Sequence, residues 1–129
     1  AKPGSADLVL TFRNVHNWMS LGEAKTQAVF DAAFKALKPG GVLGVEEHRL
    51  PASRNQDPKA PTGYVHEATV IGFAEAAGFK LAGRSEVGMA VTLAVVAGVA
   101  ETLRRGERER VGHQPAGFGS TAGAGVKST

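Results

Sequence analysis

The sequence predicts a single α/β domain, or part of one, in which parallel strands alternate with crossover helices. Two short runs rich in Leu and Val, DLVLTF and GVLGVEE, lack the polar alternation of a half-exposed strand, which is typical of strands buried on both faces. Between them lies a segment with helical periodicity, so the order is strand, helix, strand. A length of 129 residues rules out more than one full domain.

The first of these elements is a predicted strand over Asp7–Phe12. Residues 13–20 then become polar and aromatic, which predicts a loop at the end of the strand, where open α/β sheets bind their ligands. From Gly22 to Leu37 apolar residues recur at steps of three and four, which predicts an amphipathic helix. Residues 38–41, Lys-Pro-Gly-Gly, end this helix because Pro cannot continue the hydrogen-bond ladder and Gly tolerates a left-handed exit.

A second strand is predicted over Gly41–Glu47, and it makes a right-handed crossover unit with the first. Residues 49–62 hold three prolines among polar side chains, which predicts a long surface loop that is either a lid or disordered. Helical spacing over Tyr64–Ala77, closed by Gly78, predicts a second helix. Residues 79–86 alternate in polarity, which predicts a strand exposed on one side and near the sheet edge.

The chain changes character after Val87. We expect residues 1–87 to form the α/β unit and residues 88–111 to hold a further edge strand, VTLAVVA, followed by a short charged helix. Residues 112–129 contain almost nothing to bury, so we expect a disordered tail.

Composition excludes several classes of protein and of site. The chain has no Cys, which excludes a disulfide scaffold, a zinc ribbon and a thiol nucleophile. Its longest apolar stretch, the 13 residues Gly88–Ala100, is too short to cross a bilayer as a helix, so we predict no membrane span. The net charge is +3, and the only clustered Arg residues alternate with Glu between positions 101 and 110, which favours a solvated face over nucleic-acid binding.

The start of the chain carries neither an initiating Met nor a signal-peptide pattern, and we therefore expect a fragment. The sequence consequently does not indicate the cellular compartment of the protein. The default expectation is the cytoplasm, and export is the alternative.

Three segments at the joints of the predicted elements carry a family resemblance. A strand that opens with Ala6–Val9 leads to Val15–Trp18, within FRNVHNW. The segment Ala36–Gly41 leads to the strand VLGVEEHR, and Glu75–Phe79 joins a helix to a strand. Over residues 5–86 this order resembles the fourth to sixth strands of a class I S-adenosylmethionine-dependent methyltransferase, that is, its C-terminal half. Together with GYVHE, the segments FRNVHNW and GVEEHR resemble a group of bacterial proteins known as predicted methyltransferases.

The resemblance implies a Rossmann-like sheet, S-adenosylmethionine as the cofactor, and methyl transfer to a small molecule that it does not identify. The position of His16 is similar to the His of the His-Asp-Trp segment in small-molecule O-methyltransferases, with Asn17 where that family has Asp. An imidazole there can act as a general base, taking a proton from a hydroxyl or amine as the methyl group arrives. The alternative is that His16 packs in the loop, bonded to backbone.

The neighbouring polar and aromatic residues each have two interpretations. Asn14 and Asn17 either hydrogen-bond substrate or satisfy the backbone of the turn. Trp18 either stacks on a planar substrate or the adenine, or covers the core. Tyr64 either closes a lid over substrate or packs as a staple at a helix start. The resemblance also implies cofactor contacts from Arg13 and Asn14, and substrate contacts from Asn14, Asn17, Trp18, Glu47, His48 and Tyr64.

The end of the second predicted strand also carries side chains of the kinds that bind metal ions. Adjacent side chains of a strand point to opposite faces, so Glu46 and His48 share one face and Glu47 lies on the other. Glu46 and His48, joined by His66 or Glu67, would suit a divalent cation, but nothing in the spacing specifies one and we predict no metal.

The chain also departs from the family pattern. The glycine-rich loop after the first strand of that fold, and the acidic residue that ends its second strand, have no counterpart here. We therefore expect methyl transfer in a full-length parent and an inactive fragment, whose exposed sheet edge favours oligomerisation or a partner. The sequence after Val87 lacks the Asn-Pro and Gly-Val-Trp segments that the family pattern has there, which suggests a shifted reading frame in the gene. The alternative function is a non-catalytic α/β interaction module or a degenerate methyltransferase remnant.

Overall fold

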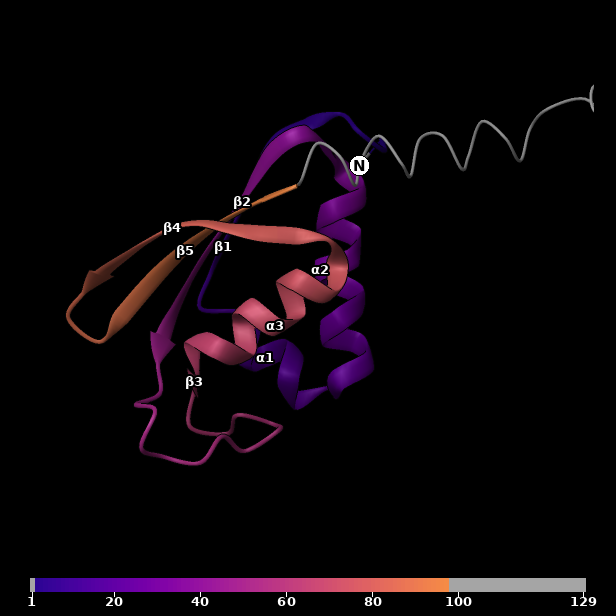
Figure 1. Ribbon diagram of the computed structural model, residues 1–129. Helices are drawn as coiled ribbons and strands as arrows, with labels where there is room; N and C mark the ends of the chain where they lie inside the picture. The colour runs from indigo at the N-terminus through magenta and orange to yellow at the C-terminus, as the bar shows by residue number, and fades with distance from the viewer. Residues whose placement is uncertain (1, 98–129) are drawn as a thin grey trace, which may run out of the picture.

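The computed structural model describes residues 2–97, which form a mixed five-stranded sheet with three helices packed on one side (Figure 1). The strand order is β1-β2-β5-β4, and β3 pairs with the far end of β2. The elements in chain order are β1 (Ala6–Phe12), α1 (Val15–Ser20), α2 (Glu23–Ala36), β2 (Leu37–Arg49), β3 (Tyr64–Val65), α3 (Glu67–Ala77), β4 (Phe79–Val87) and β5 (Ala90–Ala97). The predicted α/β class is confirmed.

The unit β1–α2–β2 is the predicted parallel crossover. β1 and β2 pair in parallel from Leu8 opposite Val42 to Phe12 opposite Glu46. The predicted turn at residues 38–41 differs, because these residues lie at the start of β2 and form an irregularity in its pairing with β1. The pairing advances by two residues on β1 and by five on β2, and the positive φ of Gly40, 79°, accommodates the extra length.

Two predicted boundaries were wrong. The loop expected over residues 13–20 is helical from Val15 to Ser20, with Val15 and Met19 buried four residues apart. A helix of six residues is too short for its periodic pattern to be distinguished from a loop in the sequence. The helix expected from Tyr64 begins only at Glu67, because Tyr64 and Val65 extend alongside the end of β2 as β3.

The strand after Val87 was predicted to lie at the edge of the sheet, and this prediction is wrong because the strand lies inside the sheet. β5 runs antiparallel to both β2 and β4, which leaves β4 as the edge strand, as predicted. β4 and β5 form a hairpin at Gly88, whose φ is 60°, and the returning strand fills the gap beside β2. The charged helix and the tail predicted beyond position 97 lie outside the described residues.

The core lies between the helices and one face of the sheet. Phe30 and Phe34 of α2, four residues apart, are buried there, and Phe34 meets Phe79 edge to face with ring centroids 5.1 Å apart. Within residues 2–97 no helix lies over the opposite face at β1, where Leu8, Leu10 and Phe12 are more than half exposed. Among the same residues, no helix is long and apolar enough to cross a membrane.

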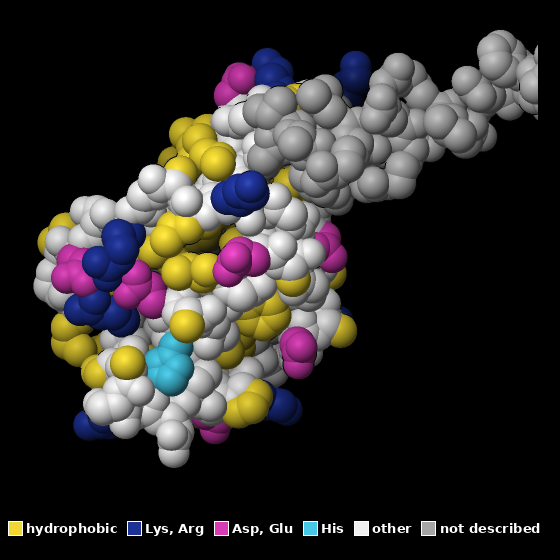
Figure 2. Space-filling view, viewed as in Figure 1, with side chains coloured by type: hydrophobic (Ala, Val, Ile, Leu, Met, Phe, Trp, Pro, Cys, Tyr) yellow, Lys and Arg dark blue, Asp and Glu magenta, His cyan; other side chains and the backbone are white. Residues whose placement is uncertain are grey.

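Four charged side chains link β2, α3 and β4. Arg84 donates to both carboxylate oxygens of Glu67, at 2.5 and 2.9 Å, and to Glu86 at 2.6 Å, while Arg49 also pairs with Glu86. Figure 2 shows basic and acidic side chains interleaved on this flank of the molecule. Hydrogen bonds from Arg84, and then from Arg49, hold the pKa of Glu86 below its ordinary value of 4.5.

This ion network predicts an acid-sensitive contribution to stability. The folded state binds the Glu86 proton less readily than the unfolded state, so the contribution is complete above pH 4.5 and is lost as the pH falls through the lowered folded pKa. Thermal unfolding followed from neutral to acidic pH should therefore show a stability advantage over Glu86→Gln that disappears at the acidic end. Parallel curves for the two proteins over the whole range would contradict this.

Candidate active site

A buried carboxylate orients a histidine at the carboxyl end of β2. Nδ1 of His16, on α1, lies 2.9 Å from Oε2 of Glu47, and the backbone N–H of His16 donates to the same oxygen at 3.1 Å. The backbone N–H of His48 donates to the other oxygen at 3.0 Å. Glu47 is only 4% exposed. An ionised carboxylate only accepts, so with Glu47 ionised the proton of the neutral imidazole lies on Nδ1 and Nε2 is the basic nitrogen.

The position of Glu47 follows from the alternation of side chains along β2. Glu46 is opposite Phe12, the last residue of β1, so Glu47 lies just past the end of that strand. It is on the face that packs against the helices, and α1 begins only three residues after Phe12. The turn between β1 and α1 therefore carries His16 over the buried carboxylate.

A strap from the long loop passes beside His16. The N–H of Ala60 donates to Asp57 O at 2.9 Å and the N–H of Gly63 donates to Ala60 O at 3.1 Å, which makes two successive turns. Ala60 is buried and has a positive φ of 46°, a costly conformation for a residue with a side chain. A Cβ at Gly63 would lie 3.9 Å from both Nε2 and Cδ2 of His16. The strap thus borders the basic nitrogen with a residue that has no side chain.

Other predicted site residues form a second group beside this pair. The rings of His48 and Tyr64 stack with centroids 5.2 Å apart. Arg13 has a positive φ of 53°, its N–H donates to Glu46 O at 2.7 Å, and its Nε lies 3.8 Å from Glu46 Oε1. Arg13 therefore turns the chain at the end of β1 while its guanidinium stays mostly exposed.

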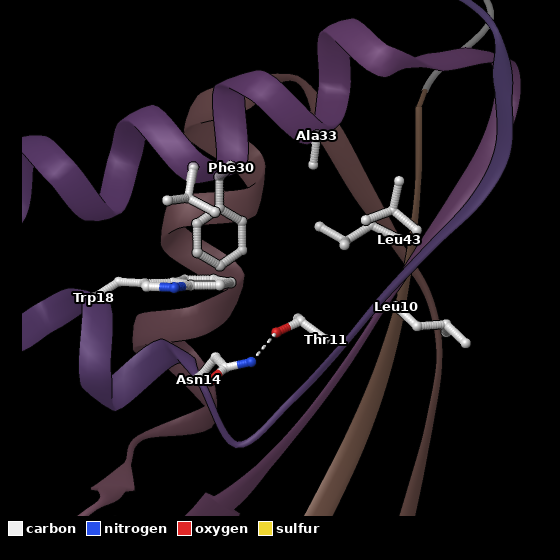
Figure 3. A pocket seen from close by; sticks show the side chains of 9 residues that line it. Leu10, Thr11, Asn14, Trp18, Phe30, Ala33 and Leu43 are labelled. Atoms are coloured by element: carbon white, nitrogen blue, oxygen red, sulfur yellow. Dashed lines mark hydrogen bonds between the residues drawn. The ribbon is translucent and has the colours of Figure 1, made fainter. Parts of the chain in front are cut away.

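The remaining candidates line or border an apolar groove rather than the histidine. A cavity of about 250 Å³ lies between β1, α1 and α2, and Asn14, Trp18 and Phe30 point into it (Figure 3). Trp18 meets Phe30 edge to face at 6.0 Å, and the Asn14 amide donates to Thr11 Oγ1 at 3.5 Å. Asn17 is exposed and bonds only locally, to Arg13 O at 3.5 Å and Asn14 Oδ1 at 3.4 Å.

The alternative of a metal site concerns Glu46 and His48 together with His66 or Glu67. Between residues 2 and 97, no three His, Asp or Glu side chains gather in a geometry that holds a metal ion. The Nε2 atom of His66 lies instead 2.6 Å from the backbone oxygen of Arg54, and its N–H donates to Gln56 Oε1 at 2.7 Å, so His66 anchors the loop.

The partnership between His16 and Glu47 is the feature that sequence reasoning missed. Both residues were candidates, one as a base and the other as a substrate contact. Side chains alternate along β2, so the sequence already indicates that Glu47 lies on the opposite face of the sheet from Glu46 and His48. The sequence does not indicate that His16 lies on the same face as Glu47, because this depends on how α1 packs.

Comparison with known proteins finds likeness in structure only. No family model matches the chain, and no curated protein matches it. An O-methyltransferase family protein from Burkholderia thailandensis is 18% identical with a TM-score of 0.58, over 74% of this chain and 31% of that one. A SAM-dependent methyltransferase from Aquifex aeolicus is 16% identical with a TM-score of 0.55, over 74% and 47%. The [4+2]-cyclase SpnF is 15% identical with a TM-score of 0.60, over 77% and 52%.

This chain spans only about a third to a half of the length of those structures. At such low identity the likeness establishes the fold alone, and the presence of a cyclase among the matches shows that the fold does not fix the reaction. The chain has the Rossmann-like α/β fold of S-adenosylmethionine-dependent methyltransferases.

Proposed function

We propose that this chain is the acceptor-activating part of an S-adenosylmethionine-dependent methyltransferase that acts on a small molecule. The observation that supports this is the pair formed by His16 and Glu47, at the carboxyl ends of β1 and β2, with the basic nitrogen beside Gly63. Ligands of open α/β sheets bind at these strand ends. A general base oriented by a buried carboxylate suits the removal of a proton from a hydroxyl or amine.

The chain's residues have defined tasks in this proposal. His16 Nε2 accepts the proton of the acceptor O–H or N–H as that oxygen or nitrogen bonds to the methyl carbon. Glu47 holds the proton on Nδ1 and stabilises the imidazolium that forms, as a carboxylate does in related dyads. Bound S-adenosylmethionine would supply the electrophilic methyl group, whose bond to sulfur breaks to leave a neutral thioether. Positioning of the acceptor beside Gly63 supplies most of the remaining rate enhancement.

The residues at the end of β1 fit part of a cofactor site. Arg13 and Asn14 are both exposed there, next to the turn that leads to His16. A guanidinium matches the carboxylate of S-adenosylmethionine and an amide matches its polar edges.

A non-catalytic interaction module is the second candidate, favoured by the apolar groove between β1, α1 and α2. This function requires neither the cofactor nor the base. Affinity for S-adenosylmethionine therefore separates the two candidates.

The test is transfer of label from methyl-labelled S-adenosylmethionine to a panel of phenols, aliphatic alcohols and amines. It is run on this chain and on any longer natural polypeptide that contains it, with cofactor binding measured by calorimetry. We expect labelled product and S-adenosylhomocysteine in equal amounts in at least one of these proteins. Neither binding nor transfer in either protein would overturn the proposal and favour the interaction module.

A further inference from the structure

We infer that Gly63 controls access to the base His16, and that the site therefore takes acceptors whose reacting hydroxyl or amine is sterically unhindered. The inference rests on the proposed reaction and deepens it by naming the class of substrate. Among the described residues, a Cβ at Gly63 would have two heavy atoms within 4 Å beyond its own neighbours in the chain, and both belong to the ring of His16. The absent side chain of Gly63 is therefore what leaves this side of the ring open.

The missing Cβ position lies next to the basic nitrogen. It is 3.9 Å from Nε2 and 3.9 Å from Cδ2 of His16, so it lies beside the bond that joins these two atoms. An acceptor has to bring its oxygen or nitrogen to about 2.6–3.2 Å from Nε2 to give up a proton, which places its substituents close to the same part of the ring. A phenol with free ortho positions or a primary alcohol fits beside a glycine. Groups that branch next to the reacting atom meet the backbone of the strap.

The strap, residues 57–63, is held on both sides of this contact. Ala60 is buried, and its carbonyl oxygen accepts a hydrogen bond from the N–H of Gly63 at 3.1 Å. The carboxylate of Asp57 accepts the N–H of Lys59 at 2.8 Å, which fixes the first turn. The residue after Gly63 begins β3, which pairs with the end of β2. The strap therefore cannot shift freely to accommodate a side chain at Gly63.

The ring of His16 is held from the other side. Its Nδ1 lies 2.9 Å from Oε2 of Glu47, and its backbone N–H donates to the same oxygen at 3.1 Å. Because this carboxylate is buried, the ring cannot turn away from Gly63 without the loss of a buried hydrogen bond. The distance between Gly63 and Nε2 is thus set by two fixed parts of the fold.

The chain offers a matched control for a side chain at this position. Gly63→Ala adds a methyl group beside Nε2, but it also strains the backbone, because Gly63 has a φ of 82°. Gly40 has a φ of 79°, and nothing in the described chain lies within 4 Å of its Cβ position. Gly40→Ala therefore carries the same strain without the contact. Gly63→Asn and Gly40→Asn form a second pair, with a larger side chain of a type that tolerates positive φ.

Access to Nε2 can be measured without the cofactor or an acceptor. Methyl para-nitrobenzenesulfonate is a bulky reagent whose methyl carbon bonds to Nε2 as the sulfonate leaves, and methyl iodide is a small reagent that reacts in the same way as iodide leaves. Mass spectrometry of peptides gives the rate of methylation at His16. We expect Gly63→Ala to slow the reaction with the sulfonate about tenfold, and Gly63→Asn to slow it further. The reaction with methyl iodide should slow less, and both Gly40 variants should react like the unmodified protein.

Methyl transfer tests the class of substrate. In whichever protein transfers label, kcat/KM should be higher for phenols with free ortho positions than for the same phenols with two ortho methyl groups. Gly63→Ala should lower kcat/KM for the unhindered phenols about tenfold, and Gly40→Ala should not.

The outcomes separate this inference from the proposed reaction. Equal methylation of His16 in the Gly63 and Gly40 variants would overturn the control of access by Gly63. Transfer that is equally fast to hindered and unhindered phenols would overturn the class of substrate while the reaction itself stands. An absence of transfer to every acceptor would overturn the proposed reaction, and with it the class of substrate, but not the control of access that the two reagents measure.

Discussion

Gly78→Ala is expected to destabilise the protein by about 2–5 kcal/mol, the sum of a backbone strain and a steric clash. Gly78 ends α3 with a φ of 112°, a conformation that residues with a Cβ rarely adopt. A Cβ there would lie 2.8 and 2.9 Å from two ring atoms of Phe34. That ring cannot move aside easily, because it is buried against Phe79.

Gly72→Ala is the matched control in the same helix. Nothing lies within 4 Å of its Cβ position, and its backbone is helical, so alanine should stabilise the protein by about 0.5–1 kcal/mol. Urea unfolding of both variants measures the contrast. Comparison of the double variant Gly78→Ala/Phe34→Leu with Phe34→Leu alone measures the strain without the clash, which separates the two contributions. If both glycine variants had the same stability, the packing of Phe34 described above would be wrong.

The parts of the fold that were predictable are those set by local periodicity. The helix from Gly22 to Leu37 repeats its apolar pattern over several turns, and the structure has α2 at Glu23–Ala36. Gly78 ends its helix as predicted, because a left-handed exit is a property of the residue itself. Local signals of this kind are independent of the rest of the chain.

Features that depend on distant neighbours were not predictable. The pattern of β5 shows a strand, but whether it lies inside the sheet or at its edge depends on how the hairpin with β4 returns. Likewise His16 and Glu47 are 31 residues apart, and alternation along β2 gives the face of Glu47 without its partner. Tertiary packing, rather than propensity, decides these contacts.

If the proposed reaction is correct, Glu47→Gln should lower kcat by about 10²–10⁴, close to the loss in His16→Gln. The amide retains the shape of the carboxylate but has one oxygen where the carboxylate has two, so it keeps both hydrogen bonds from His16 by turning its NH₂ group toward the backbone N–H of His48. In that orientation the side chain is neutral and no longer stabilises the imidazolium that forms in the reaction. The backbone N–H of His48 then faces a donor and loses its acceptor, at a cost of about 1–3 kcal/mol in stability.

Two readouts distinguish this mechanism from a structural role for Glu47. The ¹⁵N chemical shifts of the His16 ring report its tautomer directly and should show Nδ1–H in the unmodified protein and in Glu47→Gln, but a mixture of tautomers in Glu47→Ala, which removes the acceptor. Glu75→Gln, on the exposed surface of α3, removes an equal charge and should change neither the tautomer nor kcat. A folded Glu47→Gln protein with unchanged turnover would remove the pair from the mechanism, because the amide lacks the negative charge that stabilises the imidazolium.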